Sequence, residues 1–377
     1  MCKRGKIRVL QVVGGMVRGG VETWLVQVLR GIDRDRFKLD FLVHTEQPCA
    51  YDAEVRRLGS RIIPCLHPSR PFRYVRNLKK ILCENGPYDI VHSHLYLFSG
   101  LVLRTAEKSG VPIRISHVYP QADMKEGKRL RPVYRRLMTR WLSKYATVTL
   151  ACSRSSLRTF SEICDISSHH KGVIYPVVGL KQIEKKFDKS TIRRSFSLPQ
   201  NEQIVVYVAR FVPHKNHEQL LRLADRFRTR GKRIHFAVAG SHGESLERVK
   251  KECAWRDNVT LFLGLENISY LLLAADMFFF PSLEEGFGIV ALEAMAAGLP
   301  VVATDLPAIR EVCSPSFHQF MFMPNDDDAA YLNMLKILND EELKTRLSLD
   351  AREWSREFSI ENSVKKIVRM YEMNARS

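Results

Sequence analysis

The stretch of residues 277–303 constrains the fold most, because it reads as one strand–helix–strand unit. The apolar run 277–280 predicts a buried strand, which is stopped by a proline. A glycine turn follows, and residues 289–297 are apolar nearly all round, which is typical of a buried helix. The helical pattern stops at Gly298, and residues 301–303 predict the next strand. Such a unit places two parallel strands in one sheet, with a crossover helix between them.

Two sets of alternating strands and helices extend this pattern over the chain, with a polar stretch, 181–201, between them. Both sets predict the same α/β class, a right-handed doubly wound parallel sheet. We therefore expect two domains, 1–178 and 179–358. The strands expected in the first are 7–13, 37–44, 61–65, 89–94, 113–118 and 147–153, and those in the second are 203–210, 234–240, 258–264, 277–282 and 301–304.

The composition indicates which kinds of partner the protein binds and which compartment of the cell it occupies. The 377 residues carry a net charge of +18, which favours an anionic partner such as a nucleotide, a phospholipid surface or nucleic acid. The cysteines show no metal-binding or redox spacing, and Cys83 and Cys152 follow apolar stretches. We expect them to be reduced core residues of a cytoplasmic protein. The first apolar run is broken by polar residues, so we interpret it as a strand and not as a signal peptide.

Two glutamates frame the glycine turn, with seven residues between them. Glu285 follows the strand, at the carboxyl end where ligands of open parallel sheets bind. Glu293 lies about two turns into the helix. A carboxylate accepts hydrogen bonds in pairs, which suits the vicinal hydroxyls of a sugar or a ribose. Two solvated surface charges are the alternative, but a glutamate in an apolar helix needs a partner.

A pair of cations follows another predicted strand. Arg210 ends the strand, and Lys215 lies in the loop before the predicted helix 217–229. A helix N-terminus also favours anions through its free N–H groups and its dipole. This arrangement suits a diphosphate, and the cations would offset charge on a leaving phosphate. An ordinary basic loop in a basic protein is the alternative.

The first turn, residues 14–22, is rich in glycine but is not a dinucleotide or P-loop fingerprint. We interpret it as a close approach of the backbone to a ligand. His92 and His94 end the predicted strand 89–94 and share one side of it. A structural role and a role in the site both remain open for them. No carboxylate cluster accompanies them, and the acidic run 326–328 precedes a helix, where carboxylates are favoured. We therefore predict no metal site.

These motifs together resemble those of family 4 glycosyltransferases, which are retaining, nucleotide-sugar-dependent enzymes of the GT-B fold. The signature runs from Pro281-Ser282 through Glu285 and Glu293 to Val301-Val302-Ala303. Residues 49–52 and 75–77 resemble the exopolysaccharide and capsular branch, the EpsF-like enzymes. The resemblance implies two Rossmann-like domains that face each other across a cleft. It also implies an acceptor-binding first domain, a donor-binding second domain, and a last helix, within 359–377, that packs back on the first.

The resemblance also assigns roles to residues. Arg210 and Lys215 match the diphosphate clamp, Glu285 matches the donor-sugar contact, and Glu293 matches the ribose contact. One histidine of His92 and His94 matches a residue near the 6-hydroxyl of the sugar, and we assign His94. The implied catalytic residues are Arg210, Lys215, Glu285 and His94. The implied donor-binding residues are Gly19, Gly20, Arg210, Lys215, Gly264, Glu285, Gly286, Phe287, Gly288 and Glu293. The family needs no metal and no cofactor.

The predicted function is therefore transfer of a sugar, by analogy from a UDP-sugar, to a glycan or lipid-linked acceptor in exopolysaccharide or capsule synthesis. A sugar-nucleotide epimerase of the same fold is one alternative, although epimerases resemble residues 285–298 less. A basic nucleic-acid-binding protein is another, but no groove-reading motif stands out, and paired acids would repel phosphates.

A basic stretch, residues 125–144, predicts where the protein would meet a membrane. Basic side chains alternate with apolar ones at helical spacing, which predicts an amphipathic helix. The apolar stripe either packs on its own domain or docks with the basic face on anionic lipid. The expected location is the cytoplasm, with peripheral attachment to the inner face of the membrane. The predicted membrane or acceptor surface comprises Lys128, Arg129, Arg131, Arg135, Arg136 and Arg140.

Overall fold

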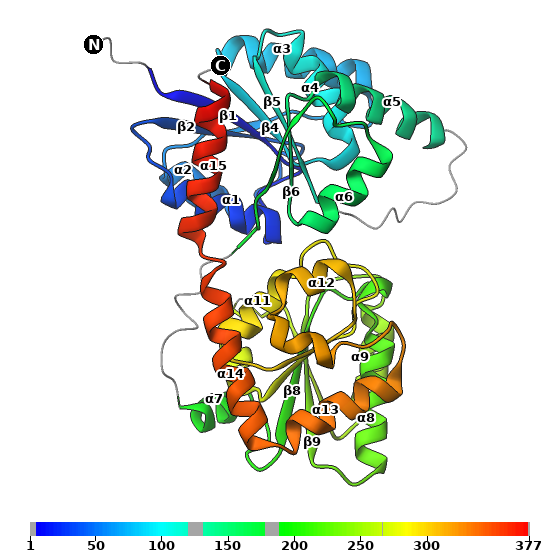
Figure 1. Cartoon of the computed structure of the whole chain (residues 1–377). Helices are drawn as coiled ribbons and strands as arrows, with labels where there is room; N and C mark the ends of the chain where they lie inside the picture. Colours follow the sequence, from blue (N-terminus) through cyan, green and yellow to red (C-terminus); the bar gives the residue numbers. More distant parts are fainter. Residues whose placement is uncertain (1–4, 120–130, 178–187, 266, 376–377) are drawn as a thin grey trace. The chain divides into compact units, whose positions relative to one another are not determined.

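A computed structural model describes residues 5–119, 131–177, 188–265 and 267–375 (Figure 1). The chain divides into two compact units. The first comprises residues 1–178 together with 360–377, and the second comprises residues 179–359. The last helix, α15 (Ile360–Ala375), is therefore part of the first unit although the second unit precedes it in the sequence.

The first unit is built on a parallel sheet of seven strands in the order β3-β2-β1-β4-β5-β6-β7. The order runs outward from β1 in both directions, so the sheet is doubly wound, as predicted. Its strands are β1 (Ile7–Val12), β2 (Phe37–Val43), β3 (Ile62–Pro64), β4 (Ile90–Ser93), β5 (Ile113–Val118), β6 (Val148–Ala151) and β7 (His170–Val173). Its other helices are α1 (Gly20–Gly31), α2 (Asp52–Arg57), α3 (Pro71–Asn85), the 3-10 turn η1 (Tyr96–Phe98), α4 (Ser99–Glu107), α5 (Arg131–Tyr145) and α6 (Arg154–Ile163).

Alternation along the strands divides the apolar core of this unit into two clusters. In β1, Leu10 and Val12 join a cluster with residues of α3, α4 and α5. Val9 joins the other cluster, which holds residues of α1 and of α15, including Tyr371. Side chains two positions apart share a face of a sheet. Gln11, next to Leu10 and Val12, therefore faces the side covered by α1 and α15.

The second unit contains a smaller parallel sheet in the order β10-β9-β8-β11-β12, which is also doubly wound as predicted. The strand–helix–strand unit of residues 277–303 forms β11, α11 and β12. The strands are β8 (Gln203–Val208), β9 (Ile234–Gly240), β10 (Val259–Leu263), β11 (Met277–Phe280) and β12 (Val301–Ala303). The helices are α7 (Lys189–Ser195), η3 (Pro213–Lys215), α8 (His217–Thr229), α9 (Leu246–Ala254), α10 (Ser269–Ala274), α11 (Ile289–Ala296), α12 (Pro307–Val312), η4 (Pro315–Phe320), α13 (Asp327–Leu338) and α14 (Glu341–Arg356).

Two features differ from the sequence-based expectation. The edge strand β7 is not predicted, because its sequence, His-Lys-Gly-Val, is polar and its first two side chains are exposed. Cys83 is exposed and not in the core, because it lies on the outer side of α3, whereas Leu82 beside it is buried. Cys152 is buried as expected. Within the described ranges, no helix has both the length and the apolar composition that a bilayer crossing requires.

Candidate functional site

The predicted site residues of the second unit follow the carboxyl ends of neighbouring strands. β8 leads through η3 into α8, and β11 leads through the glycine turn into α11. The two strands pair in parallel, so these loops leave the same edge of the sheet. A backbone hydrogen bond of 2.8 Å from Leu283 N to His214 O joins the loops. The turn chemistry at each strand end therefore decides which side chains meet.

Lys215 and Glu285 form an ion pair between these loops. The Lys215 ammonium donates to Oε1 of Glu285, and the two side chains are only 15% and 10% exposed. Ser282 Oγ donates to the same carboxylate oxygen over 3.0 Å. The Tyr207 hydroxyl donates to the carbonyl oxygen of Lys215 over 2.6 Å, which fixes the η3 turn. The structure thus brings together two residues that the sequence assigns to one site from motifs far apart.

Arg210 follows β8 and is exposed. No ion pair or hydrogen bond joins its guanidinium to another residue in the parts of the chain described above. Helix α8 begins at His217, so its N-terminal turn lies in the same loop region as Lys215. Gly264 directly follows β10, has a positive φ of 64°, and donates its N–H to Gly240 O over 3.0 Å. This edge of the sheet therefore combines a free guanidinium, an ammonium and a helix start.

The glycine turn before α11 is sterically required. Gly288 has φ +88°, and a Cβ there would lie 3.0 Å from Cε1 of Phe280. Phe287 is buried, and its ring centroid lies 5.9 Å from that of Phe358. Gly286 is half-buried in the same turn. The turn therefore fixes the direction in which Glu285 leaves β11 and the start of the helix that carries Glu293.

Glu293 is a half-buried carboxylate on α11, between the buried side chains of Leu292 and Ala294. Burial raises the pKa of this carboxyl group to about 7. Among the described residues, no hydrogen bond or ion pair reaches it. A carboxylate held without a partner retains its full capacity to accept hydrogen bonds from a ligand.

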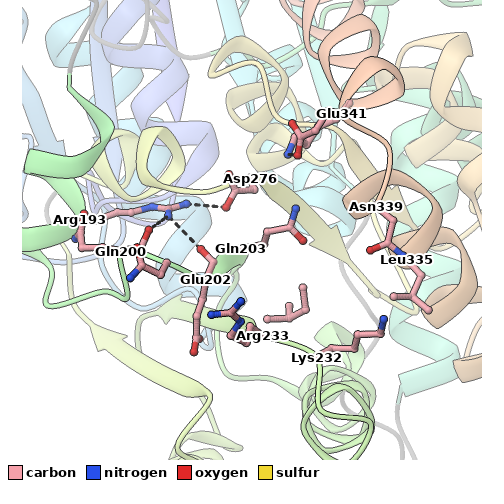
Figure 2. Close-up of a pocket in the computed structure, with 13 residues that line it drawn as sticks. Arg193, Gln200, Glu202, Gln203, Lys232, Arg233, Asp276, Leu335, Asn339 and Glu341 are labelled. Atoms are coloured by element: carbon pink, nitrogen blue, oxygen red, sulfur yellow. Dashed lines mark hydrogen bonds and ion pairs between the residues drawn. The ribbon is translucent and has the colours of Figure 1, made fainter.

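A cavity of the second unit lies away from these loops (Figure 2). It has a volume of about 480 Å³ and is lined by residues at the amino ends of the strands, among them Gln203 of β8 and Ile234 of β9. Arg193 is buried beside it and donates to Asp276 over 2.6 Å and to the Ala274 carbonyl over 2.9 Å. These polar groups satisfy one another, so we interpret them as support for the sheet and not as the site.

The acidic run 326–328 is a helix start, as expected. Asp326 caps α13 through a 2.9 Å hydrogen bond from Ala329 N. Asp327 pairs with Arg222 and Asp328 with Arg226, each over 2.6 Å. These carboxylates therefore stabilise α13 and its contact with α8.

In the first unit, the glycine-rich turn precedes α1. Gly19 is the N-cap residue of this helix, and a Cβ at Gly19 would collide with the carboxylate of Glu22. Gly20 is exposed at the first helical position. Burial raises the pKa of Glu22. The Glu22 side chain thus folds back over Gly19, and a side chain at position 19 would displace its flexible end.

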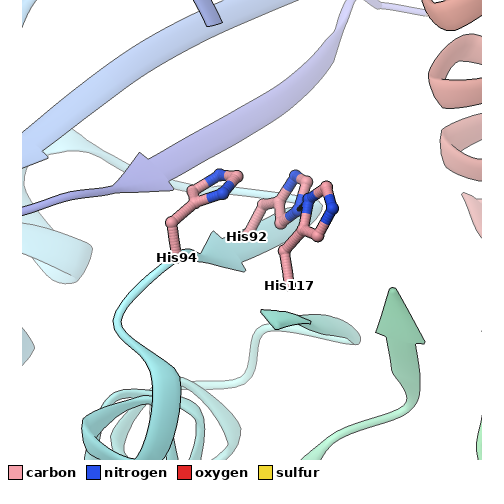
Figure 3. A group of neighbouring side chains, drawn as sticks. All are labelled: His92, His94 and His117. Atoms are coloured by element: carbon pink, nitrogen blue, oxygen red, sulfur yellow. Dashed lines mark hydrogen bonds between the residues drawn. The ribbon is translucent and has the colours of Figure 1, made fainter. Parts of the chain in front are cut away.

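A cluster of three histidines lies at the ends of β4 and β5 (Figure 3). His92 and His94 lie on one side of the strand as predicted, with ring centroids 4.2 Å apart. The structure adds His117, which the sequence analysis did not single out. One ring nitrogen of each histidine lies within 4.8 Å of the others. The sequence position of His117 could have indicated it as a site residue, because it lies near the end of a predicted strand, as His92 does.

Burial keeps these imidazoles neutral. It lowers the pKa of His94 to about 3 and holds the pKa values of His92 and His117 well below the usual value. Hydrogen bonds use most of the ring nitrogens: His92 Nε2 lies 3.3 Å from His117 Nδ1, and His94 Nε2 lies 2.9 Å from Gln11 Oε1. A metal would need a free lone pair from each imidazole. It could bind only if this network were broken.

We expect the buried histidines to make stability depend on pH. The unfolded chain protonates His94 near 6.5, whereas the folded chain does so near 3. Its contribution to the free energy of unfolding is therefore fully present above pH 6.5 and is lost as the pH falls toward 3. The loss approaches about 1.4 kcal/mol per pH unit for one such group. Urea denaturation at pH 7, 6 and 5 measures it.

His94→Gln is the matched variant for this prediction. Its free energy of unfolding should fall less steeply with decreasing pH than that of the wild type. His242→Gln is the control, because it makes the same substitution at an exposed histidine. An unchanged pH dependence in His94→Gln would contradict the assignment of a buried neutral imidazole.

Only part of the predicted basic surface can be located. Arg135, Arg136 and Arg140 lie on α5 and are exposed. The side chain of Arg131, and Lys128 and Arg129 altogether, lie outside what the structure describes.

Comparison with protein-family models matches both units. Residues 18–182 match the model described as Glycosyltransferase Family 4, and residues 188–354 match the model described as Glycosyl transferases group 1. EpsF of Bacillus subtilis (strain 168), which is named as a glycosyltransferase, is 33% identical over 312 residues, 79% of this chain and 79% of EpsF. D-inositol 3-phosphate glycosyltransferase of Thermobispora bispora is 25% identical over 306 residues, 76% of this chain and 71% of that enzyme.

Solved structures show the same fold. HepE of Anabaena, crystallised with UDP and glucose, gives a TM-score of 0.82 at 16% identity and covers 97% of this chain and 100% of its own. WaaG, a glycosyltransferase involved in lipopolysaccharide biosynthesis, gives 0.71 at 15% identity, covering 96% of this chain and 99% of its own. Of the three functions that the sequence left open, these comparisons support glycosyl transfer over epimerisation and over nucleic-acid binding. The chain belongs to glycosyltransferase family 4 and is a retaining glycosyltransferase of the GT-B fold.

Proposed function

We propose that the protein transfers a sugar from a UDP-sugar to a glycan or lipid-linked acceptor in exopolysaccharide or capsule synthesis. The observation that carries the proposal is the Lys215–Glu285 pair beside Arg210 and the start of α8. It offers cations for a diphosphate and a carboxylate for sugar hydroxyls at one edge of a sheet. The likeness to EpsF supports polysaccharide synthesis, and the UDP and glucose in HepE support the donor.

In this proposal each residue has a chemical task. Arg210 and Lys215 stabilise the charge that develops on the leaving diphosphate. Glu285 orients the donor sugar, and Glu293 accepts hydrogen bonds from the ribose. Gly264 and the turn 286–288 let the backbone approach the nucleotide. In the first unit, Gly19 and Gly20 let the backbone approach the sugar and phosphate, and His94 forms a hydrogen bond with a sugar hydroxyl.

Retention of configuration constrains the proposed reaction. The bond from the anomeric carbon to the phosphate oxygen breaks, and a bond to the acceptor oxygen forms on the same face. The acceptor proton passes to an oxygen of the departing phosphate. The proposed machinery of the second unit therefore contributes electrostatic stabilisation and orientation, and the leaving group itself serves as the base.

Hydrolysis of a panel of nucleotide sugars tests the proposal. Purified protein is incubated with UDP-, GDP- and ADP-sugars, and release of the nucleoside diphosphate is measured. A UDP-sugar should be consumed with saturation. Consumption of a GDP- or ADP-sugar alone would overturn the choice of UDP. Interconversion of sugar epimers without release of diphosphate would overturn the transferase.

The proposed membrane surface lies on α5. Its inner side packs in the core through Met138 and Leu142. Its outer side exposes Val133 by 65% and Leu137 by 40%, next to exposed arginines. Thus part of the predicted apolar stripe serves the core, and another part faces outward. We propose that this outer face rests on the anionic inner surface of the membrane.

Liposome sedimentation should show binding to anionic vesicles that weakens with salt, because the attraction is screened within about 8 Å at physiological ionic strength. Reversing Arg136 and Arg140 to Glu should lower binding at least about tenfold, at roughly 1 kcal/mol per basic residue. The control reverses the exposed pair Lys232 and Arg233 in the second unit, with the same change in net charge. Equal losses in both double variants would show a general charge effect and refute an α5 surface.

A further inference from the structure

A hydrogen-bonded network connects the last helix to the histidine cluster of the first unit. The Tyr371 hydroxyl on α15 lies 2.7 Å from Gln11 Nε2 and 2.8 Å from His92 Nδ1. From Gln11 the network continues to His94, with Oε1 and Nε2 2.9 Å apart. From His92 it continues to His117, with Nε2 and Nδ1 3.3 Å apart. All five side chains are buried.

The Tyr371 hydroxyl joins the two branches of this network, so the orientation of the Gln11 amide sets the order of donors and acceptors in both, and one orientation gives the following order. The Tyr371 hydroxyl accepts from Gln11 Nε2, so its single proton is donated to His92 Nδ1. His92 therefore carries its own proton on Nε2 and donates it to Nδ1 of His117. On the other branch, Gln11 Oε1 accepts from the Nε2–H of His94. All three imidazoles are then protonated on Nε2.

This order leaves two ring nitrogens free. Nδ1 of His94 and Nε2 of His117 are buried and have no hydrogen-bond partner in the described structure. Nδ1 of His94 is then an acceptor, and Nε2 of His117 carries a proton and is a donor. If the Gln11 amide were turned over, every bond in the network would reverse and the two nitrogens would exchange roles. In both arrangements one is a donor and one an acceptor, because a single hydroxyl joins the two branches.

A hydroxyl group is the ligand chemistry that matches such a pair, since it both donates and accepts. Aromatic side chains pack against these two imidazoles. Tyr119, whose hydroxyl is 3.1 Å from His117 Nδ1, has its pKa raised well above the usual value by burial and then by nearby charges that include Glu22 of the glycine turn. Trp24 also lies edge-on to both His94 and His117, and its Nε1 donates to Ser363 Oγ of α15 over 2.8 Å.

We propose that Tyr371 and Gln11 are positioning residues that hold His94 and His117 in matched tautomers, so that their free nitrogens bind one hydroxyl of the substrate. The proposal rests on the proposed function for the identity of the substrate. Tyr371 does not touch the substrate in this account. It couples the two branches, and thereby makes α15 part of how the first unit recognises a sugar.

Nuclear magnetic resonance of the full chain with 15N-labelled histidine tests the network without any ligand. Long-range proton–nitrogen spectra show which nitrogen of each imidazole is protonated, and single histidine substitutions assign the signals. The wild type should show the same tautomer at His92, His94 and His117. Tyr371→Phe should give mixed tautomers in at least one branch. Different tautomers among the three in the wild type, or no change in Tyr371→Phe, would overturn the proposal.

Kinetics then test whether the network serves the substrate. With the donor that the nucleotide-sugar panel identifies, Tyr371→Phe should lower kcat/KM roughly tenfold, which is the lower end of the loss seen when a metal-ligating histidine loses its outer hydrogen-bond partner. Tyr88→Phe is the matched control, because Tyr88 is a buried tyrosine of the same unit whose hydroxyl donates to Asp40 over 3.0 Å. Tyr88→Phe should be less stable than the wild type, but its kcat/KM and its histidine NMR signals should be unchanged.

The outcomes separate this inference from the proposed function. If no nucleotide sugar is turned over, the proposed function fails, and the tautomer spectra still decide the network. If turnover is unchanged in Tyr371→Phe while the tautomers mix, the network exists but the positioning role is refuted. Stoichiometric binding of Zn2+ by the wild type, lost in His117→Gln, would assign the cluster to a metal and overturn the hydroxyl site.

Discussion

Lys215→Ala should lower kcat for donor turnover by about 100-fold or more. The ammonium is the only cation in the described structure that pairs with Glu285, and in the proposed reaction it faces the charge on the leaving diphosphate. The effect should fall on kcat more than on folding, because the turn is also held by Tyr207 and by the backbone bond to Leu283. Steady-state hydrolysis of the donor, with thermal unfolding measured in parallel, gives both quantities.

Lys189→Ala is the matched control. Lys189 also forms an ion pair in the second unit, with Asp276 over 2.6 Å, but at the amino end of the sheet. It should keep its kcat. The double variant Lys215→Ala with Glu285→Gln separates two roles: if Lys215 acts only by orienting Glu285, the double variant should be no slower than Glu285→Gln alone. Unchanged turnover in Lys215→Ala would refute the diphosphate clamp.

Substitution of Glu285 and of Glu293 should have different effects on UDP affinity and on kcat. Glu285→Gln should leave UDP affinity nearly intact and lower kcat by about 100-fold, since in the proposed reaction its carboxylate orients the sugar. Glu293→Gln should weaken UDP binding about tenfold, because it would lose the proposed charge-assisted hydrogen bond to the ribose. Calorimetry with UDP on both variants measures the affinities. The reverse ranking of the two affinities would contradict the assigned roles.

The pKa of Glu293 adds a pH signature to this test. The folded-state value is about 7, so the carboxyl group is ionised above that pH and increasingly neutral below it. UDP should therefore bind the wild type more weakly as the pH falls from 8 to 6. Glu293→Gln shares the titration of UDP itself but lacks this carboxyl group, so it should show a shallower dependence. Parallel curves would refute a ribose contact by Glu293.

The sequence predicted the sheets well because parallel buried strands are continuous apolar runs. Residues 234–240 form β9 and residues 217–229 form α8 with the predicted bounds. The residues themselves predicted Glu285 and Lys215 as members of two sites, and the family resemblance assigned both to the donor. The ion pair between them was not predicted. The edge strand β7 was not predicted, because its sequence is polar and contains no apolar run.

The histidine network could not be predicted in the same way. Tyr371 lies 279 residues beyond His92, and periodicity within a helix shows only that Tyr371 faces inward, not which side chain it meets. Gln11 is a polar residue in a buried strand, and only the sheet register, which pairs it with His92, explains its presence there. Such contacts depend on how distant segments pack, which local sequence patterns do not encode.

The position of α15 makes the first unit discontinuous in the gene. Val364, Ile367 and Tyr371 complete a core whose other members lie before residue 178. A gene fragment that ends there would encode a sheet on which the part of one apolar face that α15 covers is left uncovered. An exchange of first units between relatives, made to graft a new acceptor preference, must therefore carry two separate coding segments. Recombination at a single crossover would separate His92 from Tyr371, the tyrosine to which it is hydrogen-bonded.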